Sequence, residues 1–141
     1  LGFVGEIKKV NPELLMVLLK QGFLPVVSPI GLGKDGVTYN INADTTASRI
    51  AVSLRAHKII FMTDVDGVLE KGNLCAQLTS SEVEKMIEKK VVTGGMSPKV
   101  NSCLYCVKNG VESAQIINGT EPHSLIAELF TNQGIGTKIV L

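Results

Sequence analysis

The sequence predicts an α/β fold in which a mainly parallel sheet is covered by helices on both faces, a three-layer αβα arrangement. Apolar strands alternate with helical patterns along the chain, as in folds whose parallel strands are joined by helices. The clearest strand is the apolar run from Lys58 to Thr63, which is typical of a strand buried on both faces. The 141 residues fit one domain with a sizeable core, so we expect a single lobe over residues 1–141.

The first part of the chain predicts two helices and one strand. Asn11 and Pro12 form a cap and first position for a helix, and Gly22 is expected to close it. The other expected segments are an extended piece over residues 2–7, a strand over 23–30, a turn-rich loop over 31–36 and a second helix that follows 40–44.

The second part predicts three more helices and two further strands. Thr79 with Glu82 forms a capping box at the start of one helix. Ser97 is expected to cap the next helix, with Pro98 at its first position and Gly110 at its end. The last expected segments are a strand over residues 113–118, a helix over 122–130 and a strand over 137–140.

Lys99 is the first candidate for chemistry, because it lies in the first turn of a predicted helix. The helix dipole is positive at that end, so a lysine there is favoured when an anion also binds. Gly94 and Gly95 precede the helix and would let the backbone approach a phosphate closely. The alternative is a solvated surface lysine after a flexible loop, and the local pattern leaves both possibilities open.

Two further groups lie where predicted strands end, the edge at which parallel sheets bind ligands. Asn40 offers an amide that both donates and accepts, suited to a carboxylate or amide substrate. Asp44 could hold a lysine in place, although helix capping alone would also explain these residues. Asp64-Val65-Asp66-Gly67-Val68-Leu69 follows the apolar strand and is expected to flank the adenine and ribose of a nucleotide.

The pair Asp64 and Asp66 also looks like the nucleophile motif of haloacid-dehalogenase-type phosphatases. That family needs acidic residues after a later strand, to bind magnesium. The later strand here ends in Asn118-Gly119-Thr120, which lacks the acids. We therefore prefer the nucleotide-binding interpretation.

Composition argues against several other classes of protein. The net charge of +1 and the lack of a basic run give no indication of nucleic acid or an anionic membrane as partner, and no apolar run is long enough to span a bilayer. Neither His57 nor His123 belongs to a recognisable catalytic triad. Cys103 and Cys106 are expected to pack in the core, with no metal site. The chain opens without methionine and reads as part of a longer protein.

Three motifs together carry a resemblance to a known family. They are Tyr39-Asn40-Ile41-Asn42-Ala43-Asp44, Thr63-Asp64-Val65-Asp66-Gly67-Val68-Leu69 and Thr93-Gly94-Gly95-Met96-Ser97-Pro98-Lys99-Val100. In this order and spacing they resemble the carboxy-terminal half of acetylglutamate kinases, which belong to the amino acid kinase family. The resemblance covers essentially the whole chain and implies part of that family's carbamate kinase-like fold.

The resemblance implies phosphorylation of the side-chain carboxylate of N-acetyl-L-glutamate by ATP with Mg²⁺, a step of arginine biosynthesis in the cytoplasm or a plastid. Lys99 matches a lysine that stabilises charge on the transferring phosphoryl group, Asp44 matches an aspartate that orients the catalytic lysines, and Asn40 matches an asparagine that binds acetylglutamate. The matched nucleotide-binding residues are Asp64, Val65, Asp66, Gly67, Val68, Leu69, Val91, Val92, Thr93 and Met96.

The tail of the chain resembles arginine-inhibited members of the family. The resemblance implies an allosteric L-arginine site at His123, Glu128, Gly134 and Gly136, and a homo-oligomer, either a dimer or a hexamer. The alternative is an ordinary final helix with Glu128 in solvent.

Some of the family's parts are not in this sequence. The family's amino-terminal half carries a second catalytic lysine. It also carries a Gly-Gly pair and an arginine that bind acetylglutamate. We therefore expect the 141-residue piece alone to be inactive or nearly so. Other activities that the sequence leaves open are aspartate, glutamate 5- or carbamate kinase, or a non-catalytic module that binds nucleotide or arginine.

Overall fold

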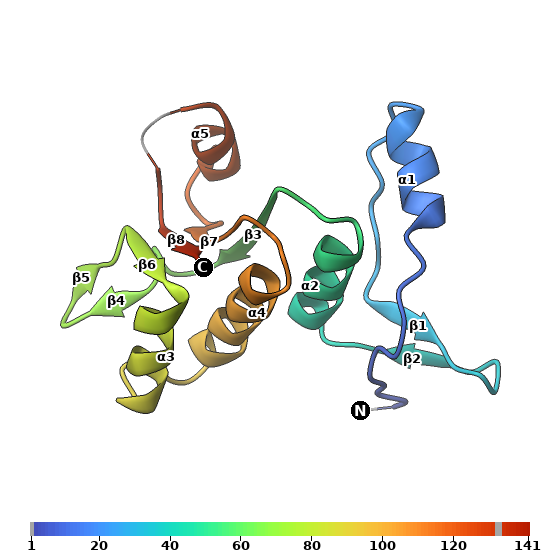
Figure 1. Cartoon of the computed structure of the whole chain (residues 1–141), viewed down its shortest axis with the longest axis horizontal. Helices are drawn as coiled ribbons and strands as arrows, with labels where there is room; N and C mark the ends of the chain where they lie inside the picture. The colour runs from blue at the N-terminus through green and yellow to red at the C-terminus, as the bar shows by residue number, and fades with distance from the viewer. Residues whose placement is uncertain (1, 132–133) are drawn as a thin grey trace.

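The computed structural model of the chain describes residues 2–131 and 134–141. Figure 1 shows the arrangement of its helices and strands. In chain order they are α1 (Glu13–Lys20), β1 (Ile30–Leu32), β2 (Thr38–Asn40), α2 (Ala43–Ser53), β3 (Lys58–Thr63), β4 (Leu69–Glu70), β5 (Asn73–Leu74), β6 (Gln77–Thr79), α3 (Ser80–Glu88), α4 (Met96–Lys108), β7 (Ser113–Asn118), α5 (Ser124–Phe130) and β8 (Thr137–Val140).

The main sheet has four strands in the order β3-β7-β8-β6. β3 is parallel to β7 and β6 is parallel to β8, whereas β7 and β8 are antiparallel. This antiparallel pair arises because the chain leaves the sheet at the end of β7, forms α5 and starts β8 from that same end of the strands. The predicted, mainly parallel sheet is therefore confirmed.

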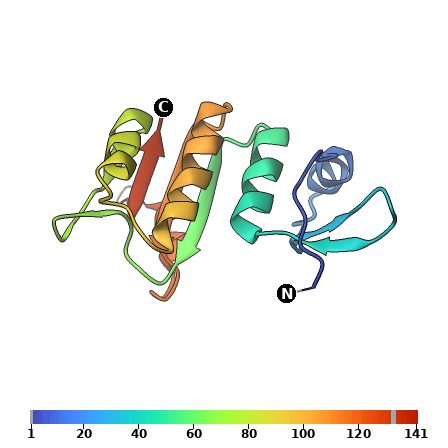
Figure 2. The same cartoon turned by 90° about the horizontal axis from the view of Figure 1, so that it is seen from below.

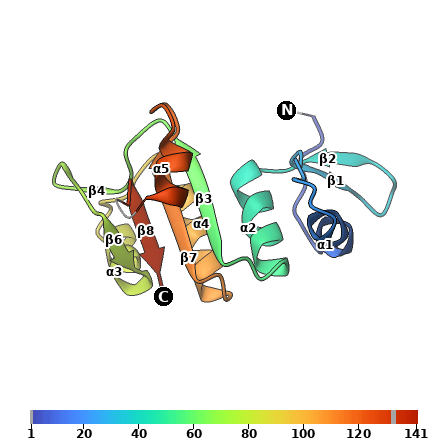
Figure 3. The ribbon, with the colours of Figure 1, turned by 90° about the horizontal axis from the view of Figure 1, so that it is seen from above.

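Helices cover both faces of this sheet. Figures 2 and 3 show α3 and α4 on one face, with α2 beside α4, and α5 on the other face. The core between sheet and helices is closely packed: Val100 and Cys103 of α4 and Ile116 of β7 are fully buried. The α/β class and its three layers are as the sequence predicts.

Several helix boundaries also agree with the sequence. The capping box at α3 is present: Thr79 Oγ1 accepts from the Glu82 N–H, and the Glu82 carboxylate accepts from the Thr79 N–H at 2.7 Å. α1 begins after Asn11, whose side chain accepts from the Glu13 N–H. α5 begins two residues later than expected, because His123 has a left-handed φ of 62° that no helix can include.

The strand expected over residues 23–30 is wrong. Residues 23–27 have no regular structure, and β1 begins only at Ile30. The apolar pattern gives these residues strand propensity, but a strand also needs a hydrogen-bonded neighbour. No described strand pairs with them, and Leu24 and Val26 are 88% and 95% exposed.

Short strands were missed elsewhere. In the loop expected over residues 31–36, Gly31 and Leu32 belong to β1, and the rest forms the tip of the β1–β2 hairpin. The strands of the β4–β5 hairpin have two residues each, and β6 has three. Strands this short show too little alternation to be found from sequence.

Residues 2–50 lie beside the main sheet rather than in it. Phe3 and Gly5 bond to the backbone of Asn40 and so extend the β1–β2 hairpin. α1 and this hairpin lie beyond α2, away from the main sheet (Figure 1). The described helices include none with the length and apolar character that a bilayer crossing requires.

Candidate functional site

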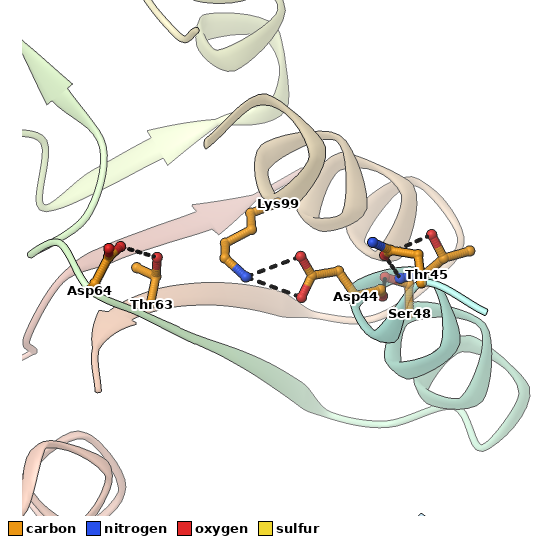
Figure 4. A network of polar contacts seen from close by, with 7 residues as sticks. Asp44, Thr45, Ser48, Thr63, Asp64 and Lys99 are labelled. Atoms are coloured by element: carbon orange, nitrogen blue, oxygen red, sulfur yellow. Dashed lines mark hydrogen bonds and ion pairs between the residues drawn. The ribbon is translucent and has the colours of Figure 1, made fainter. Parts of the chain in front are cut away.

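Lys99 and Asp44 meet between two helices that are far apart in sequence. Lys99 Nζ lies 3.2 Å from Oδ1 and 3.0 Å from Oδ2 of Asp44. The two side chains are only 20% and 22% exposed, so the alternative of a solvated surface lysine is wrong. Figure 4 shows the ammonium group pointing at the carboxylate. The cation is therefore fixed in place near the start of α4.

Close packing of α2 against α4 sets the position of this ion pair. Ser48 is buried, donates to the Asp44 carbonyl oxygen at 2.6 Å and accepts, through its own carbonyl oxygen, from Cys106 Sγ at 3.8 Å. Cys103 and Cys106 are fully buried in the core, as the sequence predicts. Burial raises the pKa of both thiols above their usual value, so they stay protonated and unreactive at neutral pH.

The start of α4 differs from the sequence prediction. Ser97 was expected to cap the helix, but the helix begins at Met96 with Gly95 before it. The Ser97 hydroxyl instead donates to the carbonyl oxygen of Val92 at 3.3 Å. Gly94 takes a left-handed φ of 59°, and this turn starts the helix without a side-chain cap. Lys99 still lies near the helix start, where unpaired N–H groups favour an anion.

The segment Asp64–Leu69 follows β3 at the carboxyl edge of the sheet. Asp64, Val65, Asp66 and Leu69 are exposed, whereas Gly67 and Val68 are buried. Thr63 Oγ1 donates to the Asp64 carboxylate at 3.2 Å. Figure 4 shows Asp64 on the same side of the sheet as Lys99. The structure therefore brings two of the sequence-predicted groups to one edge.

The remaining candidate nucleotide-binding residues differ in how far their side chains are exposed. Val91 and Thr93 are exposed, but Val92 is buried and Met96 packs against the core. Val92 can therefore contact a ligand only through its backbone.

The two asparagines near Asp44 have different surroundings. Asn42 caps α2, because its side-chain oxygen accepts from the N–H of Thr45 at 3.0 Å. Asn40 lies at the end of β2 with its side chain exposed. Capping therefore explains Asn42, while Asn40 presents an amide to solvent and Asp44 pairs with Lys99.

Glu128 is buried, so the alternative of a solvated Glu128 is wrong. Its side chain is 3% exposed. Its carboxylate accepts from Lys58 Nζ at 3.0 Å, from Gln115 Nε2 and from the N–H of Ile135 at 3.2 Å. The structure thus places Glu128 against the loop that holds Gly134 and Gly136, whereas His123 is exposed at the start of α5.

Gly136 has a structural role of its own. It takes a left-handed φ of 77°, and a Cβ there would lie 2.1 Å from the Ile116 carbonyl oxygen. Gly134 is exposed, and a Cβ there would meet nothing within 4 Å.

Sequence reasoning missed four residues that these sites use: Lys58, Gln115, Asn118 and Thr137. Lys58 and Gln115 are polar residues in apolar strands, and a polar side chain in a buried strand needs a partner. That signal was available, but it does not identify the partner. Asn118 and Thr137 contact the Asp64–Leu69 segment, and nothing in their local sequence indicates it.

In the part of the chain that the structure describes, no three or more His, Cys, Asp or Glu side chains are grouped to hold a metal ion. Asp64 is an exposed carboxylate at the sheet edge. Oxygen ligands of this kind suit Mg²⁺, which commonly binds through nucleotide phosphates and one or two carboxylates.

Comparisons with known proteins agree with this fold. The sequence profile of the amino acid kinase family matches residues 1–118. An acetylglutamate kinase of Desulforamulus reducens is 47% identical over 144 residues, covering 99% of this chain and 50% of that protein. The chain therefore spans about half the length of the curated relatives that it matches.

Solved structures give the same result for the fold. The N-acetylglutamate synthase of Neisseria gonorrhoeae, complexed with coenzyme A and L-arginine, superposes with a TM-score of 0.91 and 32% identity, covering 98% of this chain and 32% of that one. A carbamate kinase from Giardia has a TM-score of 0.72 at 17% identity over 91% of this chain and 46% of that one, which shows the fold alone. With a family match over residues 1–118, the chain belongs to the amino acid kinase family.

Proposed function

We propose that the protein in which this chain occurs is an acetylglutamate kinase, which transfers a phosphoryl group from ATP to the side-chain carboxylate of N-acetyl-L-glutamate. The observation that carries the proposal is the Lys99–Asp44 pair, a fixed cation near a helix start beside a loop suited to nucleotide. Relatives about 50% identical that bear this name support the choice of substrate.

In this proposal Lys99 stabilises the charge that spreads over the transferring phosphoryl group. Such a reaction needs little covalent help from the protein and mostly needs positioned cations and N–H donors. Asp44 fixes the direction of the ammonium group, and Asn40 binds acetylglutamate with its exposed amide. The nucleotide lies against Asp64–Leu69 and residues 91–93, with its adenine end near Met96.

We also propose that residues 1–141 form the nucleotide-binding half of the kinase domain. The relatives are about twice as long as the matched region, and the acetylglutamate side would come from outside these 141 residues. Mg²⁺ is proposed to bind with the ATP phosphates and to neutralise part of their charge, with Asp64 as a carboxylate that could reach it.

The test is an acceptor comparison with the protein at its natural length. ATP consumption is measured with N-acetyl-L-glutamate, L-aspartate, L-glutamate or carbamate as acceptor. We expect efficient turnover only with N-acetyl-L-glutamate. Preference for another acceptor would make the protein a different amino acid kinase, and nucleotide binding without turnover on any acceptor would favour a non-catalytic module.

A second proposal concerns regulation by L-arginine. Glu128 is a carboxylate held beside the Gly134–Gly136 loop, and a carboxylate is a natural partner for a guanidinium group. The synthase that superposes on this chain was solved with L-arginine. We propose that arginine inhibits the enzyme by binding at Glu128, with His123 and the loop, and that the enzyme is a homo-oligomer.

Glu128→Gln tests this proposal against Glu121→Gln, a change at an exposed glutamate nearby. We expect arginine inhibition to weaken about tenfold or more in the first variant, as for loss of a charged hydrogen bond, and to persist in the second. Unchanged inhibition in both would remove Glu128 from the site, and sedimentation of the wild-type protein would give the oligomeric state.

A further inference from the structure

The Asp64–Leu69 segment is held from two neighbouring strands of the sheet. A loop that binds a nucleotide through its backbone must keep its conformation, because misplaced binding groups lose affinity and rate. β7 and β8 lie next to each other in the sheet, and each contributes one side chain that contacts this segment.

Asn118 is the contact from β7. It stands opposite Thr63 in the parallel β3–β7 register, and its Nδ2 donates to the Asp66 carboxylate at 2.8 Å. The other side of the same amide accepts from the N–H and the hydroxyl of Thr120, at 2.9 and 2.7 Å. Thr120 therefore orients the amide so that its donor faces Asp66.

Thr137 is the contact from β8, and it is fully buried. Its Oγ1 accepts from the N–H of Val68 at 2.8 Å. Gly67 takes a φ of 146°, and a Cβ at Gly67 would lie 2.6 Å from Thr137 Oγ1. The loop thus lies directly against the start of β8, with no room for a side chain between them.

We propose that Asn118 and Thr137 are positioning residues that hold Asp64–Leu69 in the conformation that receives the nucleotide. This inference rests on the proposed kinase function. Neither residue contacts the reacting atoms. Each acts through the loop, Asn118 on its exposed carboxylate and Thr137 on its buried backbone, so loss of either affects ATP binding before it affects chemistry.

Thr137→Val is the first test, with Thr137→Ser as its matched control. Valine has the shape of threonine but leaves the buried Val68 N–H without an acceptor, while serine keeps the oxygen. We expect the KM for ATP to rise roughly tenfold in the valine variant, as for a buried donor left unpaired. The serine variant should stay near wild type, and the KM for the acceptor should change little in both.

The Asn118–Asp66 contact is tested by a double-mutant cycle that pairs the half-buried Asn118 at the end of β7 with the exposed Asp66. Asn118→Asp sets two carboxylates against each other and should raise the KM for ATP several-fold. In an Asp66→Asn background the same change restores a hydrogen bond with donor and acceptor exchanged, so it should cost little. An equal cost in both backgrounds would show that Asn118 does not act through Asp66 and would overturn its assigned role.

The wild-type protein separates this inference from the function on which it rests. Failure of the wild type to turn over ATP with any acceptor would refute the kinase proposal, and displacement of a fluorescent ATP analogue would then test the loop alone. An active wild type whose KM for ATP is unmoved by Thr137→Val would refute the inference and leave the kinase proposal standing. A fall in kcat with an unchanged KM for ATP would also overturn it.

Discussion

The two parts of the chain differ greatly in how far their apolar side chains are buried. In the sheet part, residues 58–141, helices and strands enclose a common core. In the amino-terminal part, residues 2–56, α1 has no buried residue, and a groove of about 1060 Å³ lies between residues 5–10, the β1–β2 hairpin and α2. Every described residue buried in the core cluster comes from the sheet part, except Ala51.

This difference shows that an apolar sequence pattern can form a helix without burying that helix in the core. α1 has a broad apolar face, yet Leu14 and Val17 of that face are 68% and 56% exposed. The sheet part buries a core that includes Val100 and Ile116 between its own strands and helices, although Phe130 at the end of α5 is 81% exposed. The Lys99–Asp44 pair joins the two parts, since Asp44 comes from the first and Lys99 from the second.

Breaking the Lys99–Asp44 ion pair should give the largest effect, a loss of catalytic rate. We expect Lys99→Met to lower kcat for ATP-dependent phosphorylation by roughly a thousandfold, because it removes a fixed cation from the transferring group. Lys89→Met, at an exposed lysine of the sheet part, is the control and should leave kcat unchanged. Steady-state kinetics on the natural-length protein would measure both, and a loss below tenfold would remove Lys99 from the catalytic residues.

The contrast in burial itself predicts two unequal changes in stability. Ile116→Ala, at a fully buried position of β7, should lower the free energy of unfolding by about 2–5 kcal/mol, through lost burial and the cavity left behind. Leu24→Ala, at a residue 88% exposed, should change it by less than about 0.5 kcal/mol. Urea unfolding measures both. A large loss at Leu24 would show that this residue is covered in the natural protein.

The smallest expected effect is the pH dependence of the α3 capping box. Hydrogen bonds from the N–H and hydroxyl of Thr79 hold the pKa of Glu82 below its usual 4.5. The charged carboxylate therefore stabilises the folded state above that pH, and this contribution is lost as the pH falls through the lower, folded-state pKa. The stability difference between wild type and Glu82→Gln should shrink between pH 6 and about pH 3. A constant difference would contradict the role of the charge.

Much of the sheet part follows from its sequence. The boundaries of β3, β7 and β8 and the start of α3 agree with the pattern, because apolar runs and capping residues are local signals that burial then reinforces. The strand expected over residues 23–30 fails for the opposite reason: its residues have strand propensity but no described partner.

The sequence indicates which residues are candidates for the site, but it does not indicate which of them contact one another. Lys99 and Asp44 stand out because each lies at a helix start, and the structure brings them together. The partners of Glu128 could not be found this way. Lys58 and Gln115 are polar residues in otherwise apolar strands, and both are distant from Glu128 in sequence. The Ser97 cap was wrong because the turn at Gly94 starts the helix earlier.

The chain at the entry to β8, residues 135–137, makes contacts in two directions. The N–H of Ile135 donates to Glu128, and Thr137, two residues later, accepts from Val68 of the Asp64–Leu69 segment. Thermodynamic linkage requires any coupling between ligands at these two places to be reciprocal. If, in the proposed kinase, arginine at Glu128 weakens ATP binding through this short segment, ATP must weaken arginine binding by the same factor, so more arginine would be needed for inhibition when ATP is abundant.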